Sequence, residues 1–264
     1  MSSLRESFAA ALMITAGATM AHAETMSASK NVVIVHGALA DASGWRAVHD
    51  FLIRDGFHVT IVQEPLTGLK DDVEATKRVI DQQKGPVVLV GHSYGGSVIT
   101  DAGGDPKVSA LVYVAALQPD VGEASGPLLS KFATPNANNP MMAATNRSTQ
   151  EKFLYLPPAK FHENFASDVL AADAQFMADS QQQLAQKALV APVTTAAWHT
   201  KPSYAILTTQ DHMVSPQLQR WMYQRSGAKV TEVNASHAVF VSQPAAVAQV
   251  IEAAASGAIR AAAK

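Results

Sequence analysis

Residues 87–100 of the chain read VVLVGHSYGGSVIT, a stretch in which one serine stands between glycines directly after an apolar run. The apolar run predicts a buried strand, and the residues after the glycines have the spacing of a helix. Gly91, Ser93 and Gly95 form the pattern G-x-S-x-G, in which the serine occupies a sharp, strained turn that exposes its hydroxyl. A phosphate-binding loop is the competing interpretation, but its lysine is missing and G-x-G-x-x-G does not fit. The stretch therefore predicts a strand, a turn and a helix, with Ser93 as candidate nucleophile.

The composition indicates a globular protein and excludes several kinds of site. The chain has 264 residues, of which 48% are hydrophobic and 16% are charged, as expected for a protein with a large core. Its formal net charge of −2 and the lack of a long basic run argue against nucleic acid as a partner. Because there is no cysteine, disulfides, thiol catalysis and thiolate metal sites are excluded.

Six short apolar runs along the chain predict strands. They are rich in β-branched residues and apolar on both faces, as expected of strands covered by helices. They occupy residues 31–36, 58–63, 86–91, 108–116, 203–209 and 228–233. Helical patterns lie between them, including one that starts at Pro216 and closes near Gly227, and an Ala-rich one over 242–264. This alternation predicts an α/β fold with a parallel, helix-covered sheet.

Residues 118–200 interrupt the alternation of strands and helices. The segment has no strand-like run and is rich in Ala, Gln, Met and Asn, with scattered aromatic residues. An insertion of this length after the fourth core strand is more typical of a helical cap than of a second domain with its own sheet. We therefore expect residues 24–264 to form a single domain whose cap spans approximately 118–200.

Residues 1–23 have the pattern of a signal peptide. Arg5 gives a short charged start, and residues 8–20 (FAAALMITAGATM) form an apolar stretch too short to cross a bilayer as a stable helix. The sequence AHA at 21–23 then matches a signal-peptidase site. We expect cleavage near Ala23, export to a bacterial periplasm or the exterior, and no membrane span in the mature chain.

A serine hydroxyl needs a general base before it can act as a nucleophile. Among nine histidines, His237 lies in the loop between the last predicted strand and the last helix, which can lie above Ser93 at the carboxyl edge of the sheet. Asp211 directly follows the strand predicted over 203–209 and is expected to orient the imidazole. Asp120, after the fourth strand, is the alternative acid. The order Ser93, Asp211, His237 is the one expected for a nucleophile in this type of turn.

Negative charge that develops on a substrate oxygen requires preorganised hydrogen-bond donors. Residues 35–39 (VHGAL) follow the first predicted strand and contain a tight turn at Gly37, where a backbone N–H can face the site. We assign the oxyanion donors to the backbone N–H groups of Ala38 and Tyr94, the second of which follows the serine directly.

Four segments together resemble the α/β-hydrolase superfamily. They are VVIVHGALADASGW (32–45), VVLVGHSYGG (87–96), TTQDHMVSP (208–216) and NASHAVFVSQP (234–244). The resemblance is closest to the branch of plant methyl-ester esterases, hydroxynitrile lyases and bacterial esterase relatives, and it covers the whole mature core except the cap. It implies an α/β-hydrolase fold with a sheet of about six parallel strands, since the first strand begins too near Ala23 for the two leading strands of the superfamily.

Three positions depart from the hydroxynitrile lyases of that branch. Those enzymes have lysine where Ala238 follows the histidine, threonine where Gly37 stands and glutamate where His92 stands. The differences argue against cyanohydrin cleavage. Dehalogenases and epoxide hydrolases of the same fold use an aspartate nucleophile, which Ser93 contradicts.

The residues and the resemblance together predict a serine esterase that cleaves carboxylic esters of small to medium apolar molecules through an acyl-enzyme intermediate. No cofactor or metal is expected, and the expected partner is a small-molecule ester. A perhydrolase, an amidase or a lactonase would use the same three residues. A cofactor-independent oxygenase and a ligand receptor that keeps the triad are the remaining alternatives. The sequence does not predict the oligomeric state.

Overall fold

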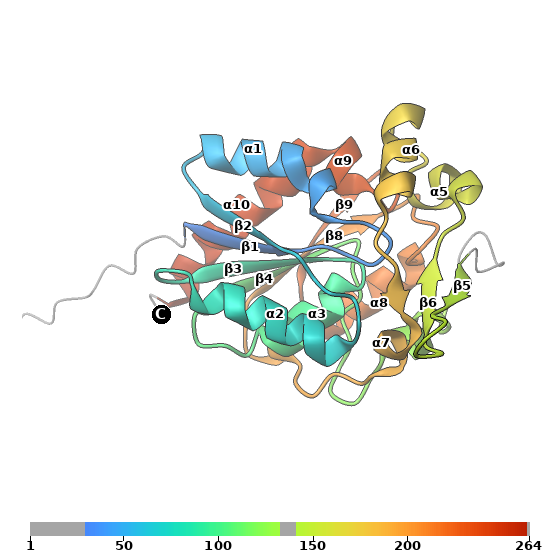
Figure 1. Cartoon of the computed structure of the whole chain (residues 1–264). Helices are drawn as coiled ribbons and strands as arrows, with labels where there is room; N and C mark the ends of the chain where they lie inside the picture. The colour runs from blue at the N-terminus through green and yellow to red at the C-terminus, as the bar shows by residue number, and fades with distance from the viewer. Residues whose placement is uncertain (1–29, 133–140, 263–264) are drawn as a thin grey trace, which may run out of the picture.

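A computed structural model of the chain describes residues 30–132 and 141–262, so the expected signal peptide, residues 1–23, lies outside the described residues. The core is a six-stranded sheet in which every neighbouring pair of strands is parallel (Figure 1). The strands run in the order β2-β1-β3-β4-β8-β9. Their bounds are β1 (Asn31–Val35), β2 (His58–Val62), β3 (Val87–His92), β4 (Val108–Val114), β8 (Ser203–Thr208) and β9 (Lys229–Val233). All six expected strands are present.

Helices cover both faces of this sheet. Successive side chains of a strand point to opposite faces, so an apolar strand presents hydrophobic side chains that need covering on each side. On β1, Val32 and Ile34 pack toward α1 (Arg46–Arg54) and α10 (Pro244–Ala262). Val33 and Val35 pack toward the opposite layer, formed by α2 (Leu69–Asp81), α3 (Gly95–Ala102) and α8 (Pro216–Ser226). The two layers are visible above and below the sheet in Figure 1. The fold is therefore the three-layered α/β arrangement that the sequence predicts.

The ends of α8 follow the expected signals closely. The Ser215 side chain accepts a hydrogen bond from the Gln217 N–H, and Pro216 occupies the first turn. At the other end Gly227 has φ +68°, the left-handed conformation that glycine adopts without a steric penalty. Among the described residues, no helix combines the length and hydropathy needed to cross a membrane.

The two edge strands differ from the prediction. β2 is only partly buried and β9 is largely exposed, whereas β1, β3 and β8 are buried along their length. The sequence KVTEV of β9 carries Lys229 and Glu232, and charged side chains on an edge strand oppose pairing with another chain. The expectation that all six runs are covered on both faces is therefore wrong for β9 and only partly met by β2.

The segment between β4 and β8 forms the cap, at one end of the sheet (Figure 1). It contains the expected helices α4 (Ser125–Leu129), α5 (Pro158–Phe165), α6 (Ala171–Ser180) and α7 (Gln186–Val190). It also contains an antiparallel three-stranded sheet, β5-β6-β7, made of β5 (Met142–Thr145), β6 (Lys152–Tyr155) and β7 (Leu184–Ala185). The expectation of a cap without strands is therefore corrected. These strands have only two to four residues, too few for a recognisable alternation of apolar and polar side chains.

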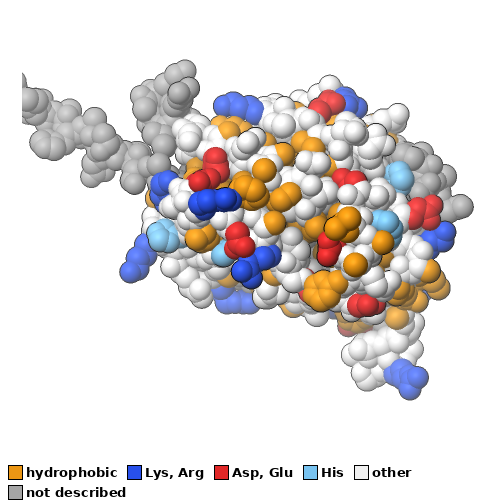
Figure 2. Space-filling view, turned by 90° about the horizontal axis from the view of Figure 1, so that it is seen from above, with side chains coloured by type: hydrophobic (Ala, Val, Ile, Leu, Met, Phe, Trp, Pro, Cys, Tyr) orange, Lys and Arg blue, Asp and Glu red, His pale blue; other side chains and the backbone are white. Residues whose placement is uncertain are grey.

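The remaining elements are short: η1 (Ala42–Trp45), α9 (Val239–Ser242) and the 3-10 turn η2 (Ala197–His199). On the face seen from above, which includes α1, acidic and basic side chains lie interspersed with exposed hydrophobic ones (Figure 2). This mixture agrees with the small formal net charge of −2.

Candidate active site

Ser93 lies in the turn between β3 and α3, with φ +52°, a left-handed conformation that is strained for a residue with a side chain. The glycines around it allow a close approach of backbone segments. A Cβ on Gly91 would lie 2.6 Å from the Gly95 carbonyl oxygen, and a Cβ on Gly95 would lie 2.6 Å from the Val35 carbonyl oxygen. A Cβ on Gly96 would meet the Leu117 carbonyl oxygen at 2.1 Å. The glycines of the motif are thus required by packing.

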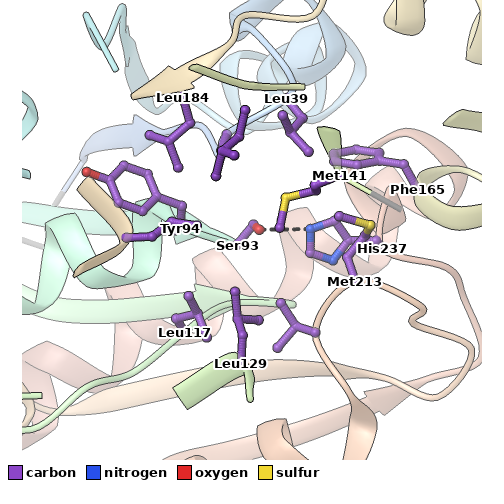
Figure 3. A pocket seen from close by; sticks show the side chains of 14 residues that line it. Leu39, Ser93, Tyr94, Leu117, Leu129, Met141, Phe165, Leu184, Met213 and His237 are labelled. Carbon is purple, nitrogen blue, oxygen red and sulfur yellow. Dashed lines mark hydrogen bonds between the residues drawn. The ribbon is translucent and has the colours of Figure 1, made fainter. Parts of the chain in front are cut away.

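His237 and Asp211 converge on this serine. His237 Nε2 lies 2.8 Å from Ser93 Oγ (Figure 3). His237 Nδ1 lies 2.8 Å from Asp211 Oδ2. Asp211 and His237 are fully buried. Because a carboxylate only accepts, the Nδ1 atom carries the proton and Nε2 is left free to accept the serine proton. The structure thus brings together the three residues that the sequence analysis selected.

Further donors hold the Asp211 carboxylate in place. Its Oδ1 atom accepts from the N–H groups of Met213 and Val214, both at 2.8 Å. Its Oδ2 atom accepts from Thr208 Oγ1 and Gln219 Nε2, both at 2.9 Å, in addition to the imidazole. These bonds fix the plane of the carboxylate, and with it the orientation of the histidine ring.

Asp120, the alternative acid, lies elsewhere. Its Oδ1 atom is 2.9 Å from His199 Nε2 in a partly exposed pair. Desolvation raises the pKa of Asp120, but the hydrogen bonds from His199 and the Val121 N–H outweigh it and lower the pKa overall. His199 follows Trp198 in η2. The indole N–H of Trp198 donates to the Pro119 carbonyl at 2.8 Å. The structure therefore brings Asp211, and not Asp120, against the His237 imidazole.

The two residues expected to supply the oxyanion donors line the same pocket as the serine. Ala38, Tyr94 and Ser93 all line one pocket. The neighbouring N–H groups are already engaged, since Leu39 donates to the Gln182 carbonyl at 3.1 Å and Ser93 donates to the Val114 carbonyl at 3.3 Å. The N–H groups of Ala38 and Tyr94 have no acceptor among the described residues.

The pocket above Ser93 is apolar and about 480 Å³ in volume, including its mouth. None of its described lining residues is a lysine, arginine, aspartate or glutamate. Figure 3 shows hydrophobic side chains around the Ser93–His237 pair on several sides. The lining beyond the residues already named consists of Leu117, Leu129, Met141, Leu154, Phe165, Leu184, Leu189, Met213 and Val214. The cap supplies much of this surface, so it shapes the space for a substrate.

A cluster of buried titratable side chains lies behind the Tyr94 side of the site. The Tyr94 hydroxyl donates to Asp72 Oδ2, and the Leu66 N–H donates to Asp72 Oδ1, both at 2.8 Å. Burial raises the pKa of Asp72 to about 6. Burial also raises the pKa of Glu64 well above its usual range, and neither of its carboxyl oxygens has a hydrogen-bond partner among the described residues. Sequence analysis missed both acids; the available signal was the position of Glu64 just after a predicted strand.

His36 contacts this cluster as a neutral group. Its Nδ1 atom donates to the Gly37 carbonyl at 2.8 Å, and its Nε2 atom accepts from the Glu64 N–H at 3.4 Å. Burial lowers the pKa of His36. Burial disfavours the charge on both His36 and Glu64, so the 3.8 Å contact between His36 Nδ1 and Glu64 Oε2 is not favoured as an ion pair.

Comparisons with known proteins agree with this geometry. The model of the Alpha/beta hydrolase family matches residues 32–250. Methylesterase 8 of Arabidopsis thaliana is 25% identical over 217 residues, 73% of this chain and 76% of the relative. Esterase PIR7B of Oryza sativa subsp. japonica is 26% identical over 248 residues, 83% of this chain and 92% of the relative.

A solved structure shows the same fold. The crystal structure of polyneuridine aldehyde esterase superposes with a TM-score of 0.73 at 21% identity, covering 84% of this chain and 98% of that one. The family match spans the sheet, the turn of Ser93 and the loops that carry Asp211 and His237. The chain therefore belongs to the α/β hydrolase family, and it is similar to members named as a methylesterase and an esterase.

Proposed function

We propose that this chain is a serine hydrolase that cleaves carboxylic esters through an acyl-enzyme intermediate. The proposal rests on two hydrogen bonds, each 2.8 Å long, that link Asp211 to His237 and His237 to Ser93. Ser93 and His237 line an apolar pocket. The names of two sequence relatives, a methylesterase and an esterase, support the same reaction class.

The geometry supports a two-step mechanism. His237 Nε2 takes the proton of the Ser93 hydroxyl while Oγ attacks the ester carbonyl carbon. The carbonyl oxygen gains negative charge and accepts hydrogen bonds from the N–H groups of Ala38 and Tyr94. The protonated imidazole, held by Asp211, then gives its proton to the departing alcohol. In the second step water attacks the acyl-enzyme with His237 again as base, and Ser93 is regenerated.

The pocket favours an uncharged substrate of small to medium size. Its lining offers hydrophobic contact and, among the described residues, no charged side chain to pair with an ionised group. Burial of an unpaired charge is costly, so an ester with a free carboxylate in this space would bind weakly. Amides, lactones and acyl transfer to peroxide would use the same residues, and a panel of matched substrates separates these reactions.

Replacement of Ser93 by alanine tests the nucleophile. We expect the S93A variant to lose p-nitrophenyl butyrate hydrolysis by roughly 10³-fold or more, because the remaining site can bind but cannot form the acyl-enzyme. The matched control is Ser97→Ala, one helical turn further along α3, whose Oγ lies 2.9 Å from Ser125 Oγ. Undiminished turnover by folded S93A would refute the assignment, and a comparable loss in S97A would show that the assay reports damage to α3 instead.

We also infer that residues 1–23 direct export to the periplasm or the exterior and are then removed. The supporting observation is the apolar stretch 8–20 followed by AHA at 21–23. Intact-mass analysis of the protein recovered from an exporting host is expected to give a chain that starts at Glu24. Recovery of the full-length chain from the cytoplasm alone would contradict this inference.

A further inference from the structure

His92 is the last residue of β3 and immediately precedes Ser93. It is fully buried, and its Nε2 atom lies 3.0 Å from the carbonyl oxygen of His237, 145 residues away in sequence. Because a carbonyl oxygen only accepts, Nε2 carries the proton and donates it. One hydrogen bond thus joins the strand that ends at the nucleophile to the backbone of the residue that supplies the base.

The ring of His92 is held by aromatic neighbours. Its centroid lies 4.6 Å from those of His237 and Phe240, 6.0 Å from that of Phe165 and 6.3 Å from that of Trp45. Desolvation lowers the pKa of His92 well below its usual range, and the nearby His237 lowers it further. The ring is therefore a neutral, sterically confined donor, which suits it to fixing the position of a backbone.

The other nitrogen of His92 faces the turn that carries the oxyanion donor. A Cβ on Gly37 would lie 2.7 Å from His92 Nδ1 and 2.8 Å from Ser93 Cβ. The Nδ1 atom has no hydrogen-bond partner among the described residues, so its contact with this turn is one of packing. His92 therefore lies between the Gly37–Ala38 turn on one side and the His237 backbone on the other.

We propose that His92 is a positioning residue that holds the His237 backbone in register with Ser93 through the bond from Nε2 to the His237 carbonyl. This inference rests on the proposed function, in which His237 is the base. Its physical basis is the sensitivity of proton transfer to distance, since a displacement of about 1 Å in an active site can cost roughly 10²-fold in rate. The bond from His92 fixes the backbone of His237, whereas the bond to Asp211 fixes only its imidazole ring.

The His237 loop has other attachments, so loss of the His92 bond should shift it without releasing it. The Ala238 N–H donates to the Phe165 carbonyl at 3.0 Å, and Ser236 Oγ bonds to Asp168. Both acceptors belong to the cap side of the site. We therefore expect variants at His92 to fold and to show a displaced base.

The experiment compares His92→Gln with His92→Leu. The glutamine amide can place a donor near the position of Nε2, whereas leucine has similar bulk and no donor. We expect H92L to lower kcat for p-nitrophenyl butyrate about 10- to 100-fold with KM changed less than about 3-fold, and H92Q to recover most of that loss. Thermal unfolding of both variants separates the effect on rate from an effect on stability.

Crystal structures of the two variants give a readout that does not depend on activity. In H92L the distance from His237 Nε2 to Ser93 Oγ should exceed hydrogen-bond length, and in H92Q it should remain near the 2.8 Å of the native chain. An unchanged distance in H92L, or equal loss of kcat in both variants, would overturn the positioning role. If H92L does not fold, His92→Asn, whose amide is too short to reach the carbonyl, takes its place. A native chain without esterase activity would refute the proposed function and leave the distance comparison to decide the role of His92.

Discussion

Asp211 makes more hydrogen bonds than the orientation of one imidazole requires. Its Oδ2 atom is shared by His237, Thr208 and Gln219, and its Oδ1 atom accepts from two backbone N–H groups. A carboxylate with all its acceptor sites occupied cannot rotate, so it holds the histidine in the tautomer with a free Nε2. At the scale of single residues, the proposed chemistry depends on this fixed acid.

Replacement of Asp211 by asparagine should lower kcat about 10³- to 10⁴-fold, because the amide favours the wrong imidazole tautomer. The matched control is Asp120→Asn, which removes the carboxylate next to exposed His199 and should leave kcat within about 2-fold. Steady-state hydrolysis of p-nitrophenyl butyrate, with melting temperatures of both variants, measures the effect. A large loss in D120N together with an active D211N would reverse the assignment of the acid.

Among the elements, α2 and α3 meet at the bond between Asp72 and the Tyr94 hydroxyl. The bond holds the side chain of the residue whose N–H is proposed to bind the oxyanion. Desolvation of Asp72 opposes its ionisation more strongly than the hydrogen bonds from the Tyr94 hydroxyl and the Leu66 N–H favour it. The pKa of Asp72 is therefore raised to about 6. The contact between the two helices is therefore expected to change as pH passes through about 6.

The pKa of Asp72 predicts how stability changes with pH. Because the folded value of about 6 exceeds the ordinary value of 3.8, the native state binds more protons than the unfolded state between these limits. The contribution is fully present below the ordinary value and is lost as pH rises through about 6. The difference in unfolding free energy between the native chain and Asp72→Asn should fall by about 2 kcal/mol from pH 4 to pH 7. Urea titrations across this range measure it, and a difference that is constant or rises with pH would contradict the assignment.

Some helices and strands could be located from the sequence and others could not. The four central strands and α8 could be located from sequence because a long apolar run, a proline and a terminal glycine are local signals. The strands of the cap could not, since β7 has two residues and owes its conformation to pairing with β6. Exposure of β2 and β9 depends on strand order, which no single run reveals.

At the scale of the whole molecule, the parallel sheet gathers residues that are far apart in the chain. Ser93 follows β3, Asp211 follows β8 and His237 follows β9, and the carboxyl ends of parallel strands share one edge. This rule made all three residues predictable from sequence. The contact of His92 with the His237 backbone was not predictable, because it depends on how the last loop packs between the sheet and the cap.

The proposed mechanism predicts a covalent adduct on the Ser93 oxygen atom. The native chain incubated with a p-nitrophenyl alkylphosphonate, which mimics the tetrahedral intermediate, should release one equivalent of p-nitrophenol, and peptide mass mapping should place the phosphonyl group on Ser93. His237→Ala should form the adduct far more slowly, because the serine then lacks its base. Modification at another residue, or none at Ser93 in a folded chain, would contradict the account.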